Sequence, residues 1–284
     1  MSSSEGAPRD PQAERRLDDL GPRVASGAVL AVFGLAVTIA GGPWIAGATG
    51  AAVVIMSYEW TRMSEPKSLS AAFAFCVVGA LGAVMAASWG QYPLAFAIMV
   101  GCGIASATRR RGLAPALETA GGVIYIGAPC VLFLALREHQ PDGALLILSL
   151  FAIIWSADAA AYFGGKLIGG PKLVPNLSPA KTWSGFASGT IAGMAAAAAV
   201  AVQIGGPAAT WSFVGAVLAL VGLFGDLFES LLKRRFGVKD ASRVIPGHGG
   251  VLDRIDGLMA ATVVTATVLA AAPGFWLVLL GRTP

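Results

Sequence analysis

Residues 145–164 read LLILSLFAIIWSADAAAYFG and contain one charged side chain, Asp158. A run of about 20 apolar residues has the length that a helix needs to cross the hydrocarbon core of a bilayer. The same character extends through the chain, because 56% of its 284 residues are hydrophobic and 13% are charged, whereas soluble domains carry about 25% charged residues. The sequence therefore predicts an all-α integral membrane protein and excludes a single soluble domain.

Outward from this run, the charge-poor stretches predict about nine transmembrane helices. Single helices are expected at residues 119–136, 145–164 and 257–281. Three longer runs each contain an internal break of glycine with proline, which does not continue a helix, and each therefore predicts two helices. These runs lie between Arg23 and Glu59, between Lys67 and Arg109, and between Lys181 and Asp226.

The basic residues predict the orientation of these helices, because Lys and Arg accumulate on the cytoplasmic side of membrane proteins. With the N-terminus in the cytoplasm, 18 of the 20 basic residues fall in cytoplasmic segments, and only Arg137 and Arg282 fall outside. The two longest loops, about residues 165–182 and 233–256, then share the cytoplasmic face. We expect a disordered cytoplasmic tail at 1–22 and one polytopic domain at 23–284, divided into N-terminal helices (23–140) and a catalytic half (141–284).

The charge of the chain is concentrated in residues 230–256, SLLKRRFGVKDASRVIPGHGGVLDRID. This segment holds 6 of the 20 basic residues, 3 of the 16 acids and 1 of the 2 histidines. Such a cluster beside a glycine-rich turn is typical of a site that holds a polyanion at the membrane face. The pI of about 9.1 indicates a basic loop surface that faces anionic lipid headgroups or a phosphorylated ligand. No nucleic-acid-binding motif accompanies it.

Asp226, Ser230 and Lys233 are spaced to share one face of a helix that leaves the membrane. An acid, a hydroxyl and an ammonium in a row suit a metal–phosphate site, although charges also accumulate wherever a helix enters water. Downstream, Asp253 and Asp256 are neighbours on a helical first turn. They either bind Mg²⁺ together with Asp226 or simply favour the helix dipole.

Between these acids lies a turn, Pro246-Gly247-His248-Gly249-Gly250, whose composition does not continue a helix. Such a turn lets the backbone approach a ligand closely and direct N–H groups at phosphate oxygens. His248 either donates to a phosphate, acts as an acid, or is a structural loop histidine.

A second cluster follows the run quoted first. Asp158, Tyr162 and Lys166 share one helix face, and an acid within the membrane is a functional hypothesis by default, the alternative being a partnered structural acid. Residues 177–182, a rigid polar turn with the ammonium of Lys181, either reach a phosphate or anchor at headgroups.

Glu59 lies between Tyr58 and Trp60 at the end of an apolar run. Aromatic residues at that depth are typical of the belt at a membrane interface. We interpret this trio as structural.

Together these residues resemble the signature of the CDP-diacylglycerol synthase family, also called phosphatidate cytidylyltransferase. The pattern S-x-x-K-R-x4-K-D-x5-P-G-H-G-G-x-x-D-R-x-D is filled at every fixed position by Ser230, Lys233, Arg234, Lys239, Asp240, Pro246 to Gly250, Asp253, Arg254 and Asp256. Upstream, Asp158-x3-Tyr162-x2-Gly165-Lys166 and Ser178-Pro-x-Lys181-Thr182 also match. One departure is Ser184, where the family usually has Glu. The N-terminal half matches only as generic apolar helices.

The resemblance implies that phosphatidate attacks the α-phosphorus of CTP, giving CDP-diacylglycerol and pyrophosphate, with Mg²⁺ and with K⁺ as a second cation. It implies metal ligation by Asp226, Asp253 and Asp256. The implied catalytic set is Asp226, Lys233, Arg234, Lys239, Asp240, His248, Asp253 and Arg254. The implied substrate-binding set is Asp158, Tyr162, Lys166, Ser178, Lys181, Thr182, Ser230, Gly249 and Gly250. The resemblance also implies a homodimer in the bacterial cytoplasmic membrane.

Two alternatives share parts of this pattern. A CTP-dependent lipid kinase would have a similar nucleotide site but would transfer the γ-phosphate. A membrane transporter also has many helices, Gly/Pro breaks and an intramembrane acid. Against a transporter, the polar residues gather at the predicted cytoplasmic face and no inverted repeat is visible.

Overall fold

The computed structural model describes residues 20–65, 70–242, 244 and 249–282. Nine helices of 16 residues or more occur in this described part of the chain. They are α2 (Leu20–Ala40), α3 (Gly42–Ser64), α4 (Ala71–Ser88), α5 (Tyr92–Ala107), α6 (Leu113–His139), α7 (Gly143–Leu167), α8 (Trp183–Ile204), α9 (Ala208–Arg235) and α10 (Leu252–Ala271). A short helix, α11 (Phe275–Leu279), follows them.

Six helices of the described chain are long and apolar enough to cross a membrane: α4, α6, α7, α8, α9 and α10. Two shorter apolar helices accompany them, residues Gly27–Ala40 within α2 and the whole of α5. The prediction of a predominantly helical membrane protein is therefore confirmed. The predicted helix at 257–281 is wrong in its bounds, because Pro273 and Gly274 end the helical run and separate α10 from α11.

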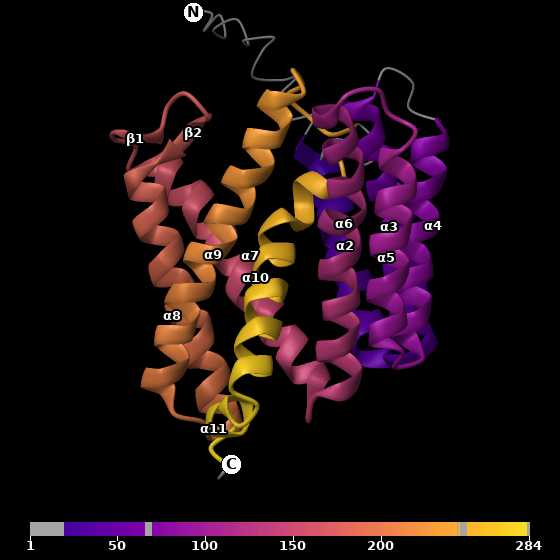
Figure 1. Cartoon of the computed structure of the whole chain (residues 1–284). Coiled ribbons are helices and arrows are strands. Elements are labelled where there is room, and N and C mark those ends of the chain that lie inside the picture. The colour runs from indigo at the N-terminus through magenta and orange to yellow at the C-terminus, as the bar shows by residue number, and fades with distance from the viewer. Residues whose placement is uncertain (1–19, 66–69, 243, 245–248, 283–284) are drawn as a thin grey trace, which may run out of the picture.

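Two strands interrupt the helices. β1 (Lys172–Val174) and β2 (Ser178–Thr182) form an antiparallel hairpin that pairs Lys172 with Thr182 and Val174 with Ser178. Residues 177–182 were expected to be a turn, but the turn lies earlier, at residues 175–177, where Pro175 and Asn176 favour a chain reversal. The hairpin sits at one end of the helices, beside the start of α8 (Figure 1).

The helices form two groups that lie side by side (Figure 1). α3, α4, α5 and α6 share one apolar core, and α7, α8, α9, α10 and α11 contribute most of a second. Ala241, Leu252 and Met259 belong to the first core, although they come from the C-terminal half of the chain. The segment that leads into α10 therefore packs against the N-terminal helices.

In the second group, small residues let the helices approach closely, as is common within membranes. A Cβ atom added at Gly215 of α9 would lie 2.4 Å from the carbonyl oxygen of Gly193 in α8. Similarly, a Cβ atom at Gly189 of α8 would lie 2.9 Å from the carbonyl oxygen of Ala157 in α7. These contacts fix α7, α8 and α9 relative to one another.

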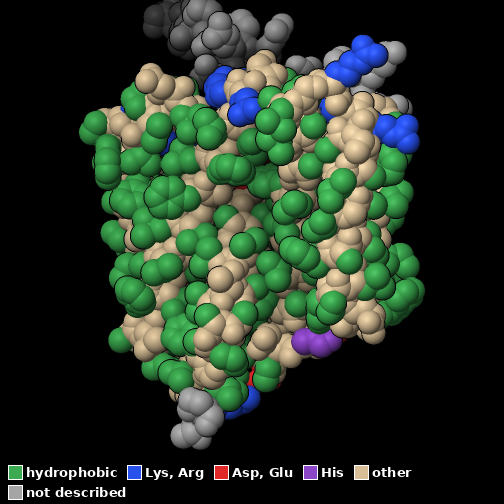
Figure 2. Space-filling view, viewed as in Figure 1, with side chains coloured by type: hydrophobic (Ala, Val, Ile, Leu, Met, Phe, Trp, Pro, Cys, Tyr) green, Lys and Arg blue, Asp and Glu red, His purple; other side chains and the backbone are tan. Residues whose placement is uncertain are grey.

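The ends of the helices differ in charge. α3, α5, α7 and α9 end at the same end of the protein as the start of α2, and α11 lies at the other end (Figure 1). On the face shown in Figure 2, most Lys and Arg side chains gather at the end where α2 starts. The apolar side chains cover the middle of that face (Figure 2).

Gly215→Ala should destabilise the protein, because its new methyl group has no room against Gly193; overpacking of this kind costs about 1–3 kcal/mol. The matched control is Gly101→Ala in α5, where nothing lies within 4 Å of the added Cβ atom. Thermal unfolding in detergent should show a lower Tm for Gly215→Ala only. Equal shifts in the two variants would contradict the close α8–α9 contact.

Candidate active site

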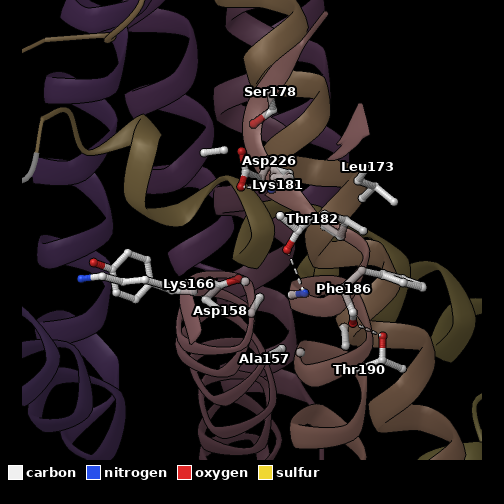
Figure 3. A pocket seen from close by; sticks show the side chains of 18 of the residues that line it. Ala157, Asp158, Lys166, Leu173, Ser178, Lys181, Thr182, Phe186, Thr190 and Asp226 are labelled. Carbon is white, nitrogen blue, oxygen red and sulfur yellow. Dashed lines mark hydrogen bonds and ion pairs between the residues drawn. The ribbon is translucent and has the colours of Figure 1, made fainter. Parts of the chain in front are cut away.

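A cavity of about 580 Å³ lies between α7, α8, α9 and the start of α10, next to the β1–β2 hairpin. Figure 3 shows its lining from close by. The cavity brings together predicted site residues from four separate stretches of sequence. They are Asp158, Tyr162 and Lys166 of α7, Ser178, Lys181 and Thr182 of β2, Asp226 of α9, and Asp253, Arg254 and Asp256 of α10.

The α7 residues lie on one face, as their spacing predicts. Tyr162 is 61% exposed, and the Nζ atom of Lys166 lies 5.6 Å from its ring centroid, within the range of a cation–π contact. Asp158 is one helical turn further along the same face and is exposed to the cavity. α7 thus supplies an acid, a phenol and an ammonium to one wall.

The β1–β2 hairpin carries a base that pairs with an acid of α9. The Nζ atom of Lys181 forms an ion pair with the carboxylate of Asp226, and Figure 3 shows the two side chains meeting. Asp226 also accepts a hydrogen bond from the Oγ atom of Ser230 at 3.4 Å. Its carboxylate remains 44% exposed, so it has room for a further partner.

Thr182 and Ser184 hold the start of α8. Thr182 is the N-cap of this helix, since its Oγ1 atom accepts a hydrogen bond from the backbone N–H of Gly185 at 3.1 Å. The Oγ atom of Ser184 lies 3.0 Å from Thr182 Oγ1 and donates to the carbonyl oxygen of Gly169. Ser184, which replaces the expected acid, therefore ties α8 to the chain that follows α7.

Behind the cavity wall, Lys233 bridges two acids. Its Nζ atom lies 2.8 Å from Oε2 of Glu229 and 2.8 Å from Oδ1 of Asp253. Lys233 is only 14% exposed, so the alternative of a charge that simply accumulates where a helix enters water is wrong for this residue. The second oxygen of Asp253, Oδ2, accepts the backbone N–H groups of Gly250 at 2.9 Å and Ala241 at 3.2 Å.

The remaining predicted residues that the structure describes lie away from the cavity lining. Arg234, Lys239 and Asp240 are exposed at the end of α9 and in the loop after it. Gly249 and Gly250 pack instead against carboxylates, because an added Cβ atom would lie 3.0 Å from Asp253 Oδ2 and 2.7 Å from Glu59 Oε1, respectively. His248 lies outside the described residues.

The predicted magnesium ligands do not form an all-protein cage. No group of three or more His, Cys, Asp or Glu side chains in the described ranges is arranged to hold a metal ion by itself. However, Mg²⁺ usually takes one or two carboxylates together with substrate phosphates. Asp158, Asp226 and Asp256 all line the cavity, so the donor set has the right chemistry for Mg²⁺ bound with a phosphorylated substrate. The oxygens of Asp253 are instead engaged by Lys233 and by two backbone N–H groups.

Three residues near the site were not among those predicted. Lys172 of β1 lines the cavity. Glu229 is 1% exposed, and its spacing of four residues from Lys233 is the local signal that would have found it. Glu59 is completely buried and accepts hydrogen bonds from residues more than 180 positions away.

The predicted aromatic belt around Glu59 is wrong for Trp60. Its side chain is 3% exposed and belongs to the first apolar core. The Nε1 atom of Trp60 donates to the carbonyl oxygen of Glu118 at 3.1 Å, and its ring packs edge-on against Phe236. α3 therefore faces the protein interior at this level.

Comparison with known proteins identifies the family of this chain. The sequence model of the cytidylyltransferase family matches residues 22–272. A phosphatidate cytidylyltransferase of Brucella suis is 37% identical over 252 residues, covering 86% of this chain and 91% of that protein. Proteins of the same name from Rickettsia bellii and Staphylococcus aureus are 37% and 40% identical over 164 and 139 residues, which cover 55% and 48% of this chain and 69% and 52% of those proteins.

The matched region includes every helix that lines the cavity, together with the N-terminal helices that pack beside them. The chain belongs to the cytidylyltransferase family.

Proposed function

We propose that this protein is a phosphatidate cytidylyltransferase, which joins CTP and phosphatidate to give CDP-diacylglycerol and pyrophosphate. Family membership and the names of the relatives support the reaction. The observation that carries the assignment of the site is the single cavity where Asp158, Lys181, Asp226, Arg254 and Asp256 converge. Acids for a metal ion and bases for phosphate groups thus line one space between helices of membrane-spanning length.

The chemistry demands charge stabilisation more than proton transfer. An oxygen of the phosphatidate phosphate attacks the α-phosphorus of CTP, and the bond to pyrophosphate breaks. A phosphate monoester has a second pKa of about 6, so the nucleophile is already largely ionised near neutral pH and needs no strong base. Catalysis then depends on positioning and on neutralising the oxygens of the transferred group.

The basic residues of the cavity suit that task. Lys166, Lys172, Lys181 and Arg254 line it from α7, the hairpin and α10. Lys181 already contacts a carboxylate oxygen, that of Asp226, and a phosphate oxygen offers the same kind of partner. We assign these four side chains to the triphosphate and the lipid phosphate, and we keep Arg234, Lys239, Asp240 and His248 as further members of the catalytic set.

Asp226, Asp256 and Asp158 would hold Mg²⁺, with K⁺ as a second cation, and the metal ions would neutralise phosphate oxygens. The exposure of Asp226 supports this role, because its side chain remains 44% exposed beside Lys181 and has room for a metal ion. We place Asp253 in the supporting layer, because Lys233, Gly250 and Ala241 engage both of its oxygens.

The same proposal includes the membrane arrangement. α2 to α10 are the nine spans, the N-terminus and the cavity face the cytoplasm, and the membrane is the bacterial cytoplasmic membrane. The gathering of Lys and Arg at one end supports this orientation (Figure 2), as does the positive-inside rule. CTP then enters from the cytosol and phosphatidate from the bilayer. We also propose residues 1–22 as a cytoplasmic tail, the division at 140/141, and a homodimer.

Purified protein with Mg²⁺, phosphatidate and CTP labelled at the α-phosphorus should move the label into the lipid fraction. A CTP-dependent lipid kinase would leave this label in nucleotide and would transfer label only from the γ-phosphorus. A transporter would give no lipid product. Retention of all the α-label in water-soluble nucleotide would refute the proposed reaction.

Asp226→Asn should lower kcat by about 100-fold or more, because it removes a charge that acts on the transition state. The matched control is Asp142→Asn, since Asp142 is also 44% exposed and also paired with a base, Arg282, at the opposite end of the protein. The control should stay within about twofold of the unmodified protein. Similar losses in both variants would argue against a specific role for Asp226.

Asp253→Asn should also abolish turnover while the protein still inserts, but for a different reason. The Asn amide would place its N–H donors against the donors that now hydrogen-bond to Asp253, namely the Lys233 ammonium and the backbone N–H groups of Ala241 and Gly250. A titration with Mg²⁺ separates the two roles. Excess Mg²⁺ should partly restore Asp226→Asn and should not restore Asp253→Asn; full activity of Asp253→Asn would rule out the supporting role.

A further inference from the structure

We propose that Glu59, in the N-terminal helix α3, is a positioning residue for the cytidylyl-transfer site, because its carboxylate holds the segment that leads into α10. The inference rests on the proposed function for the identity of the reaction. It assigns a role in that reaction to the N-terminal half of the chain, which contributes none of the residues that line the cavity.

Glu59 makes three hydrogen bonds to one short region of the C-terminal half. Its Oε1 atom accepts from Ser242 Oγ at 2.6 Å and from the backbone N–H of Val251 at 2.8 Å. Its Oε2 atom accepts from the backbone N–H of Leu252 at 2.8 Å. The side chain is 0% exposed. Burial of a carboxylate is costly unless hydrogen bonds satisfy it, and these three contacts meet that need.

The contacts supply a cap that α10 does not have in its own sequence. The residue before the helix is Val251, which offers no side-chain hydrogen bond to the first turn. The first N–H groups of a helix need acceptors from elsewhere, and a negative charge at that end is also favoured by the helix dipole. Glu59, from the separate helix α3, provides both the acceptor oxygens and the negative charge.

The glycine at position 250 leaves the space that the Glu59 carboxylate occupies. A Cβ atom added at Gly250 would lie 2.7 Å from Glu59 Oε1 and 2.9 Å from its carboxyl carbon. Only glycine allows the backbone to pass this close without displacing the acid. The signature glycine at position 250 thus has a packing reason that involves Glu59.

Asp253 holds the same segment from the other side. It accepts the N–H groups of Ala241 and Gly250, while Glu59 accepts from Ser242, Val251 and Leu252. The two carboxylates together fix where the chain leaves the region of α9 and where it enters α10.

The first turn of α10 is the part of the site that depends on this arrangement. Asp253, Arg254 and Asp256 line the cavity from the start of α10, whereas Glu59 is not one of its lining residues. A change at Glu59 therefore alters catalysis through the position of α10. The residues of α7, α8 and β2 that line the remaining walls keep their own contacts.

The experiment compares Glu59→Gln, Glu59→Leu and Ser242→Ala with the control Glu138→Gln. Glu138 also accepts a backbone N–H, that of Gly42 at 3.0 Å. It belongs to the last turn of α6, and this helix ends at the opposite end of the protein (Figure 1). Glu59→Gln and Ser242→Ala should each lower kcat about tenfold, and Glu59→Leu about 100-fold or more, in line with the strength of hydrogen bonds to a charged group. The KM for phosphatidate should change less than about twofold, and the control should match the unmodified protein.

Hydrogen–deuterium exchange gives a readout that does not depend on activity. In Glu59→Gln, the peptide that contains Val251 and Leu252 should exchange faster, while peptides from α6 and α8 keep their protection. This local pattern separates positioning from general destabilisation and remains measurable if Glu59→Leu does not fold. Unchanged kcat and unchanged exchange in Glu59→Gln and Ser242→Ala would overturn the proposal. Failure of the unmodified protein to label lipid would refute the reaction and leave the exchange result standing.

Discussion

The carboxylate of Asp253 is the contact on which the arrangement of the site depends. It joins Lys233 of α9, the loop residue Ala241 and Gly250 at the entrance to α10. Lys233 in turn contacts Glu229, so a largely buried cation lies between two acids from different helices. Removal of Lys233 would leave both acids without their counter-charge in a region of low dielectric, which is far more costly than loss of a surface ion pair.

Local spacing predicted much of this site. The intervals of four residues along α7 and α9 correctly grouped Asp158 with Tyr162 and Asp226 with Ser230. The breaks at glycine and proline likewise separated the helices, with Gly41 between α2 and α3 as one case. These features follow from the period of the helix and from backbone conformation, which are written in neighbouring residues.

Other features have no local signal. The contacts of Glu59 join residues separated by 183 to 193 positions, and no periodicity reports such a pair. The hairpin was also missed, because residues 178–182 are polar and carry no alternation of apolar side chains. Ser184 departs from the family pattern, which usually has Glu at this position, and no local pattern predicted that its hydroxyl is engaged at the start of α8.

The packing of residues 241 and 252 into the core of the N-terminal helices has a consequence for synthesis. α3 leaves the ribosome long before α10. The carboxylate of Glu59 therefore lacks its hydrogen-bond donors in the C-terminal half until most of the chain has been made. The catalytic end of the protein is therefore completed only when the last long helix arrives, and a truncated product that ends before α10 would insert its earlier helices without acquiring a finished site.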